Sequence, residues 1–200
     1  MIKKISSRIW KFSYPFTSSS NVYLFKSEDH FILIDSGDNS IKEQLKKEIE
    51  KITSLSNIDT ILLTHLHYDH IGNLDLFNHA KIYASKKEID SYNKSPDSTI
   101  NGFEVKGYDI IKEKNLKINE LPSEIHGIKV IDVPGHTVGC VSFYLEKDLV
   151  LFSGDHIFDK DFKIIGRSDF KNSEPNSYSE SLNKIKKLNY KILCPGHDYI

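Results

Sequence analysis

The sequence has little cysteine, no long hydrophobic run and no excess of charge of either sign. Its 200 residues include two cysteines, Cys140 and Cys194, which are too few for a disulfide framework and too far apart for a thiolate zinc site. No apolar stretch approaches the length of a membrane-spanning helix, and the N-terminal segment lacks the apolar run of a signal peptide. We therefore expect a soluble, cytoplasmic protein with reduced cysteines.

The charges are balanced and dispersed along the chain. Lysine and arginine number 27 against 28 aspartates and glutamates, and neither sign forms a long block. Nucleic-acid-binding proteins generally carry a basic patch or stripe, so neither a nucleic acid nor a membrane is expected as a partner. The length fits one domain covering residues 1–200 and does not indicate an oligomeric state.

Short apolar segments alternate with amphipathic segments throughout the chain. The first amphipathic segment is expected to begin after a cap at Asn39 or Ser40, and the aperiodic segments 95–104 and 159–176 are expected to be loops that shape substrate access. The alternation favours the α/β class, with two sheets covered by helices. The predicted strands are 22–25, 31–34, 58–63, 81–84, 128–133, 141–145, 149–152 and 191–194, and the predicted helices are 40–52, 86–92 and 178–188.

The most informative segment is 64–70, with the sequence Thr-His-Leu-His-Tyr-Asp-His. It places three imidazoles and a carboxylate directly after a predicted buried strand, where loops held by a rigid scaffold often carry functional groups. Imidazole and carboxylate together suit first-row divalent metals. A single histidine is most often packed or solvated, but this density inside the chain indicates a metal site.

Three more candidate ligands, His136, Asp155 and His197, each follow an apolar strand and a glycine. In layered α/β folds the loops that leave strand ends meet at one edge, so these side chains are expected to join the cluster at residues 64–70. The remaining histidines outside these patterns, His30 and His79 among them, are expected to be surface or packing residues, as is His126.

These motifs resemble those of the metallo-β-lactamase superfamily over almost the whole chain. The resemblance implies a four-layer αββα sandwich of two mixed β-sheets flanked by helices. The matching elements are the His-x-His-x-Asp-His motif at His65, His67, Asp69 and His70, the later motifs Gly135-His136-Thr137, Gly154-Asp155 and Pro195-Gly196-His197, and the early turn Asp35-Ser36-Gly37.

The resemblance also implies roles for these residues. Two divalent metal ions are expected, zinc in the first place with iron or manganese as alternatives. Asp35 is expected to hold a ligating histidine in place without binding the metal itself. Asp155 would bridge the two ions together with a water or hydroxide, and Asp69 would orient the proton of that water. The first ion would be held by His65, His67 and His136, and the second by Asp69, His70 and His197.

The element Gly166-Arg167-Ser168-Asp169 resembles one found in glyoxalase II-like hydrolases and in persulfide dioxygenases. Arg167 would contact an anionic, thiol-derived substrate or form an ion pair within the fold, and both options stay open. Tyr68 is expected to line the substrate pocket. The long C-terminal extension that binds glutathione in glyoxalase II has no counterpart here, so glutathione specificity is not expected. His156 replaces a threonine common in the family and is expected to fill space rather than to approach the metals.

The predicted function is therefore a binuclear metallohydrolase, similar to hydroxyacylglutathione hydrolase, that cleaves a small thiol-linked substrate at its thioester. The first alternative is a mononuclear iron persulfide dioxygenase, using His65, His67 or His136 with Asp155 as a site of two histidines and one carboxylate. The second is a lactonase or other carboxylic-ester hydrolase. A non-catalytic metal-binding role is also open. The sequence leaves undecided the acyl and thiol parts of the substrate and the physiological metal.

Overall fold

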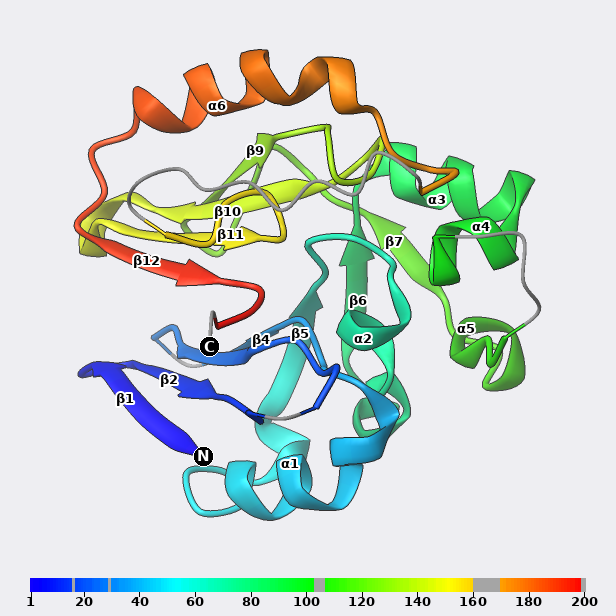
Figure 1. Ribbon diagram of the computed structural model, residues 1–200. Coiled ribbons are helices and arrows are strands. Elements are labelled where there is room, and N and C mark those ends of the chain that lie inside the picture. Colours follow the sequence, from blue (N-terminus) through cyan, green and yellow to red (C-terminus); the bar gives the residue numbers. More distant parts are fainter. Residues whose placement is uncertain (16, 29, 103–106, 160–169, 199–200) are drawn as a thin grey trace.

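The computed structural model describes residues 1–15, 17–28, 30–102, 107–159 and 170–198. Two mixed β-sheets lie face to face, and helices cover their outer faces (Figure 1). The predicted fold class, an αββα sandwich, is confirmed.

The larger sheet has seven strands in the order β1-β2-β3-β4-β5-β6-β7. Its first four strands pair antiparallel, and β4 to β7 pair parallel, as expected where helical segments connect the strands. The strands are β1 (Ile2–Ser6), β2 (Ile9–Phe12), β3 (Val22–Lys26), β4 (Phe31–Ile34), β5 (Ile58–Leu62), β6 (Lys81–Ala84) and β7 (Ile118–Glu120).

The smaller sheet has five strands in the order β12-β11-β10-β9-β8. Strands β8 to β11 form an antiparallel meander, and β12 joins β11 in parallel after the chain has passed through a helix. The strands are β8 (Glu124–Ile125), β9 (Ile128–Asp132), β10 (Val141–Leu145), β11 (Val150–Gly154) and β12 (Ile192–Pro195).

Three apolar clusters separate the four layers. The middle cluster joins the facing sheets, with Phe25 and Ile34 from the larger sheet against Phe143 and Phe152 from the smaller one. A second cluster lies between the larger sheet and the helices below it, and a third lies under the C-terminal helix. Burying these side chains is worth roughly 1.5–3 kcal/mol each and holds the layers together.

The helices are short and present one apolar side to a sheet. Helix α1 lies against the larger sheet and α6 against the smaller one (Figure 1). Helix α1 buries Leu45 and Ile49 in this contact, and α6 buries Ile185. Among the described residues, no helix is long and apolar enough to cross a membrane. The helices are α1 (Lys42–Ile49), α2 (Tyr68–Ile71), α3 (Lys86–Lys94), α4 (Pro96–Asn101), α5 (Ile110–Glu113) and α6 (Tyr178–Lys186), with short 3₁₀ turns at 39–41, 55–57, 74–77, 146–148 and 175–177.

The structure differs from the sequence-based expectations in several places, and it adds α5, β7 and β8, which the sequence analysis did not predict. The segment 95–104 is not a loop throughout, because α4 begins at Pro96, whose fixed φ angle suits the first turn of a helix. The cap before the first helical segment is Asp38, whose carboxylate accepts a hydrogen bond from the amide of Ser40 at 2.7 Å. The N-terminal residues form the antiparallel pair β1 and β2, which the sequence analysis did not predict.

Candidate metal centre

Three histidine nitrogens meet where loops from the two sheets come together. His65 and His67 lie in the loop after β5, and His136 lies in the loop after β9. The Nδ1 atom of His67 lies 3.0 Å from Nε2 of His65 and 3.0 Å from Nε2 of His136. All three side chains are buried, and one nitrogen of each lies within 4.8 Å of the other two. The ligands of a single cation are arranged in this way.

The electrostatic surroundings keep these three rings neutral. Burial, reinforced by the neighbouring imidazoles, lowers the pKa of His67 to about 3 and that of His65 well below its usual range. Burial also lowers the pKa of His136. A neutral imidazole is the form that binds a metal ion, so this group requires no loss of protons before binding.

A second group of donors consists of Asp69, His70 and His197. The Oδ2 atom of Asp69 lies 3.1 Å from Nε2 of His197 and 3.8 Å from Nε2 of His70. Burial disfavours a charged ring here too, but nearby carboxylates outweigh it and raise the pKa of His197 to about 10 and that of His70 well above its usual range. Without a cation, the protonated rings balance the acidic side chains.

Asp155 follows β11 and faces both groups. Its Oδ2 atom lies 3.6 Å from Nε2 of His136 in the first group and 3.4 Å from Nε2 of His197 in the second. Its Oδ1 atom lies 3.3 Å from Nε2 of His70. Burial tends to raise the pKa of this carboxyl group, but the imidazolium rings of His197 and His70 hold it well below its usual range.

Two properties of these donors suit a metal ion: some of their buried atoms lack hydrogen bonds, and their chemical type is that of metal ligands. Nε2 of His70 and Oδ1 of Asp155 are buried and lie 3.3 Å apart, but in the described part of the chain neither atom makes a hydrogen bond of good geometry. Buried polar atoms without a hydrogen bond are uncommon in proteins and cost free energy, so two of them at the centre of a donor cluster fit a site for a cation. Nitrogen and carboxylate donors are those preferred by zinc and iron.

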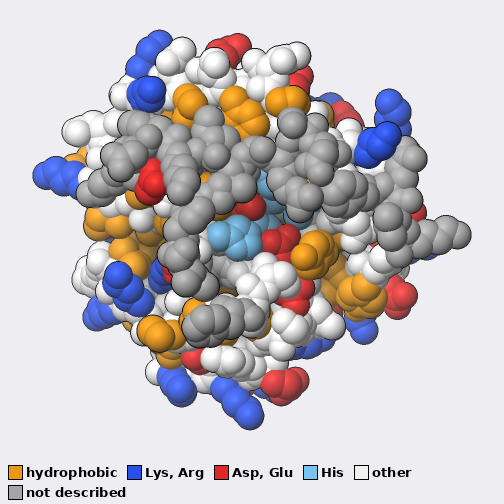
Figure 2. Space-filling view, in the orientation of Figure 1, with side chains coloured by type: hydrophobic (Ala, Val, Ile, Leu, Met, Phe, Trp, Pro, Cys, Tyr) orange, Lys and Arg blue, Asp and Glu red, His pale blue; other side chains and the backbone are white. Residues whose placement is uncertain are grey.

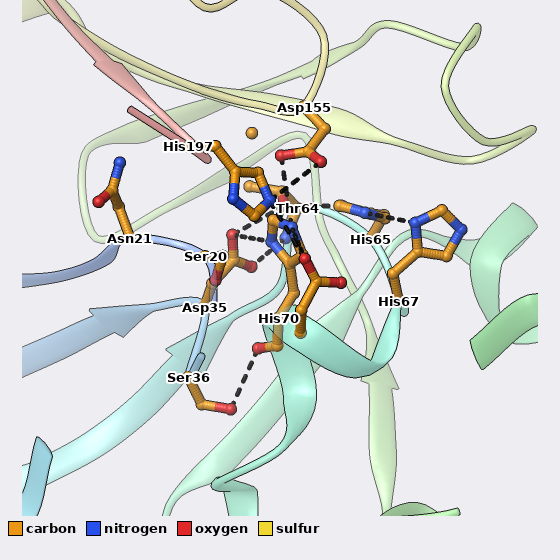
Figure 3. A network of polar contacts seen from close by, with 12 residues as sticks. Ser20, Asn21, Asp35, Ser36, Thr64, His65, His67, His70, Asp155 and His197 are labelled. Carbon is orange, nitrogen blue, oxygen red and sulfur yellow. Dashed lines mark hydrogen bonds and ion pairs between the residues drawn. The ribbon is translucent and has the colours of Figure 1, made fainter. Parts of the chain in front are cut away.

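Asp35 supports His70 from the side opposite the donor cluster (Figure 3). Its Oδ2 atom accepts hydrogen bonds from Nδ1 of His70 and from the Thr64 hydroxyl, both at 2.8 Å, and its Oδ1 atom accepts one from the Thr64 amide at 2.9 Å. Asp35 has a φ of +56°, a conformation that aspartate and asparagine tolerate better than most residues. The contact orients the ring of His70 and aims its Nε2 atom at the cluster.

Glu88, near the start of α3, is a buried residue of this region that the sequence analysis missed. Its carboxylate accepts hydrogen bonds from the amide of Leu66 at 3.0 Å, from the amide of Gly139 at 3.1 Å and from the hydroxyl of Thr137. The available signal was the pattern Ser85-x-x-Glu88, which predicts a reciprocal helix cap. Ser85 does cap α3, but the carboxylate of Glu88 points to the histidine loops instead.

The donors open onto a cavity of about 250 Å³. Apolar walls come from Ile100, Phe158 and Phe170, and the ring of Phe170 makes an edge contact with His67 at a centroid distance of 5.0 Å. Figure 2 shows histidine and acidic side chains at the bottom of a hollow, with apolar side chains beside them. Tyr68, which is 42% exposed, and Asn101 line this cavity and also a neighbouring one of about 180 Å³.

The other residues singled out by sequence lie in different surroundings. Arg167, with the rest of the Gly166–Asp169 element, lies outside the described residues. His156 is buried and stacks on Tyr178 at a centroid distance of 5.4 Å, outside the donor groups found in the described chain. His30, His79 and His126 are exposed, away from the cavity.

Comparisons with known proteins show which family and which structures this chain resembles. The family model described as the metallo-beta-lactamase superfamily matches residues 16–197. A probable metallo-hydrolase of Streptococcus pyogenes is 32% identical over 198 residues, covering 90% of this chain and 79% of the relative. A hydroxyacylglutathione hydrolase of Buchnera aphidicola is 34% identical over 177 residues, covering 88% of this chain but only 60% of that protein. The solved structure of TTHA1623 in a di-iron-bound form matches with a TM-score of 0.68 and 24% identity, covering 94% of this chain and 90% of that one.

Proposed function

The chain belongs to the metallo-β-lactamase superfamily, and from this premise we propose that it is a binuclear metallohydrolase that cleaves thioesters of the hydroxyacyl-thiol kind. The observation that carries the proposal is the position of Asp155 between two complete groups of donors, with one carboxylate oxygen within 3.6 Å of a histidine from each group. A carboxylate shared in this way lets two cations lie close together.

The two donor groups divide the ligands between two ions. Zinc is proposed first, with iron or manganese as alternatives, because the donors suit all three. Bound there, the ions would lower the pKa of a coordinated water toward neutrality and polarise a carbonyl group. We assign His65, His67 and His136 to one ion, Asp69, His70 and His197 to the other, and Asp155 to both.

The remaining chemistry belongs to side chains of this chain. Asp69, whose carboxylate is held by His197, is positioned to orient the proton of the attacking water. Ile100, Phe158 and Phe170 provide a largely apolar cavity that limits access of bulk water. Hydrolysis consumes one water and yields a carboxylic acid and a thiol. A thiolate is a good leaving group, so the reaction requires no strong general acid.

The kind of substrate is supported by the relatives. The Buchnera aphidicola relative is named a hydroxyacylglutathione hydrolase, and this chain spans 60% of its length. We therefore propose a small thiol-linked substrate and leave the identity of its thiol open. We also propose that the protein acts in the cytoplasm. Tyr68 is proposed to contact this substrate at the rim of the cavity, and Arg167 is proposed to contact an anionic group of it.

A second candidate function follows from a third donor group, formed by His65, His70 and Asp155. Two histidines and one carboxylate are the ligands of mononuclear non-haem iron oxygenases. This set favours a persulfide dioxygenase as the alternative. The two candidates differ in metal stoichiometry and in their use of molecular oxygen.

The deciding experiment combines elemental analysis of the natively purified protein with assays on glutathione and coenzyme A thioesters, on a persulfide and on a lactone. We expect two metal ions per chain and thioester cleavage without oxygen uptake, and both lost in Asp155→Ala. One iron per chain with oxygen uptake on the persulfide would replace the hydrolase proposal with the dioxygenase. Cleavage of a lactone in place of every thioester would reassign the substrate class.

A further inference from the structure

Glu88 joins the two loops that carry the three-histidine group. One carboxylate oxygen, Oε2, accepts the amide of Leu66, the residue between His65 and His67. The other, Oε1, accepts the hydroxyl of Thr137, the residue after His136, and the amide of Gly139. A single side chain therefore contacts both sources of ligands to the proposed first metal.

These loops follow strands of different sheets, and one backbone hydrogen bond, from the amide of Val141 to the carbonyl of Thr64 at 2.9 Å, joins them beside the histidines. The loop with His65 and His67 follows β5 of the larger sheet, and the loop with His136 joins β9 to β10 of the smaller sheet. Glu88 reaches both from a third element, α3, which lies against the second loop: a Cβ atom at Gly139 would be 2.5 Å from the Glu88 amide nitrogen.

The chemistry of this contact is not explained by stability of the fold alone. Glu88 is fully buried, and its three donors are two amides and a hydroxyl, none of them charged. Burying a carboxylate among neutral groups costs free energy that a neutral side chain would avoid. A cation bound by the histidines on either side of Leu66 would offset part of this cost through its opposite charge.

We propose that Glu88 is a positioning residue that holds the His65–His67 loop and the His136 loop at the separation required to bind the first metal ion. This rests on the proposed metal centre but is specific to one of its two positions. Asp35 supports the other position through its hydrogen bond with His70. Each group of ligands is therefore held in place by its own buried carboxylate.

The substitution Glu88→Gln tests this with minimal change of shape. An amide offers one acceptor oxygen where the carboxylate offers two, so one of its –NH₂ hydrogens must face the amide of Leu66 or that of Gly139. One loop therefore loses its hydrogen bond and meets a repelling donor. Thr137→Val removes only the hydroxyl and should act in the same direction with a smaller effect. Glu48→Gln is the matched control, because Glu48 is a mostly buried glutamate on α1, remote from the histidine loops.

The measurement is zinc affinity at each position, from competition titrations, with anomalous diffraction from crystals at limiting zinc to assign the occupied position. We expect Glu88→Gln to weaken zinc at the three-histidine position by about 10- to 100-fold and to leave the other position within about threefold, with no change in Glu48→Gln. Equal weakening of both positions, or none, overturns the proposal. If Glu88→Gln does not fold, the same comparison in Thr137→Val decides. Absence of zinc from both positions in the wild-type protein would instead refute the proposed metal centre.

Discussion

The Oδ2 atom of Asp35 lies 2.8 Å from Nδ1 of His70, and this contact determines which nitrogen of the ring faces Asp155. A carboxylate only accepts hydrogen bonds, so Nδ1 must carry a proton. In the neutral ring Nε2 then holds the free electron pair, and it is Nε2 that lies 3.3 Å from Asp155. The pair thus sets the tautomer of a proposed metal ligand.

The substitution Asp35→Asn should reverse that tautomer. Asparagine tolerates the positive φ of this position, so the backbone is preserved, but its –NH₂ group would donate to Nδ1 of His70 or oppose the amide of Thr64. We expect metal affinity at the Asp69, His70 and His197 position to fall by about 10- to 100-fold. Isothermal titration with zinc measures this. A wild-type affinity at that position would show that the contact does not act through the ring.

Gly196 leaves room for Asp155, and Gly196→Ala should remove that room. A Cβ atom there would lie 2.1 Å from Oδ1 of Asp155 and 2.9 Å from the carbonyl carbon of Gly154, which belongs to backbone. The carboxylate must shift, and a displacement of about 1 Å at a catalytic group can cost about 100-fold in rate. We expect a loss of that order in kcat and less than two metal ions per chain by elemental analysis.

The control for Gly196→Ala is Gly127→Ala in the turn between β8 and β9. A Cβ atom at Gly127 would meet nothing within 4 Å, but its φ of +76° is strained for alanine by about 1 kcal/mol. This variant should lose some stability and keep its metal and its activity. Similar metal loss in both variants would mean that general destabilisation, and not the displaced carboxylate, is responsible.

The sequence predicted the fold and the layout of the candidate site through features that are local. His65, His136, Asp155 and His197 each follow a strand, and apolar periodicity locates the strands. The hairpin β1–β2 was missed because β2 interrupts its apolar pattern with Lys11, which is buried through its ion pair with Asp198. Such a partner, 187 positions away, is not visible in local sequence.

Glu88 was missed for a related physical reason. Two of its three partners are backbone amides, at Leu66 and Gly139, which lie 22 and 51 positions away. Every residue except proline has an amide, so no residue type marks these partners in the sequence. A local pattern, the helix cap with Ser85, already accounted for a glutamate at that place. Only the folded chain shows that the carboxylate points elsewhere.

Both cysteines should resist thiol reagents in the folded protein. Burial raises the pKa of Cys140 and of Cys194 to about 12. A raised pKa favours the protonated thiol, so at pH 8 about one molecule in 10,000 carries the reactive thiolate, against roughly a quarter for an unfolded chain. We expect labelling by a chromogenic disulfide reagent at pH 8 to occur only after denaturation. The exposed-thiol control is Ser56→Cys, and rapid labelling of the native wild-type chain would contradict the expectation.

Tyr68 should act on substrate binding more than on the chemical step. Its ring lies at the junction of the two cavities and is 42% exposed, next to Asp69 but outside every donor group found in the described chain. An aromatic contact with substrate is worth about 1 kcal/mol, so Tyr68→Ala should raise KM by about five- to tenfold while kcat changes by less than about threefold. Tyr68→Phe separates the ring from the hydroxyl: a KM near that of the wild type indicates contact through the ring, and a KM like that of Tyr68→Ala indicates a hydrogen bond to the substrate. A loss confined to kcat in both variants would show instead that Tyr68 serves Asp69 and the metal ions.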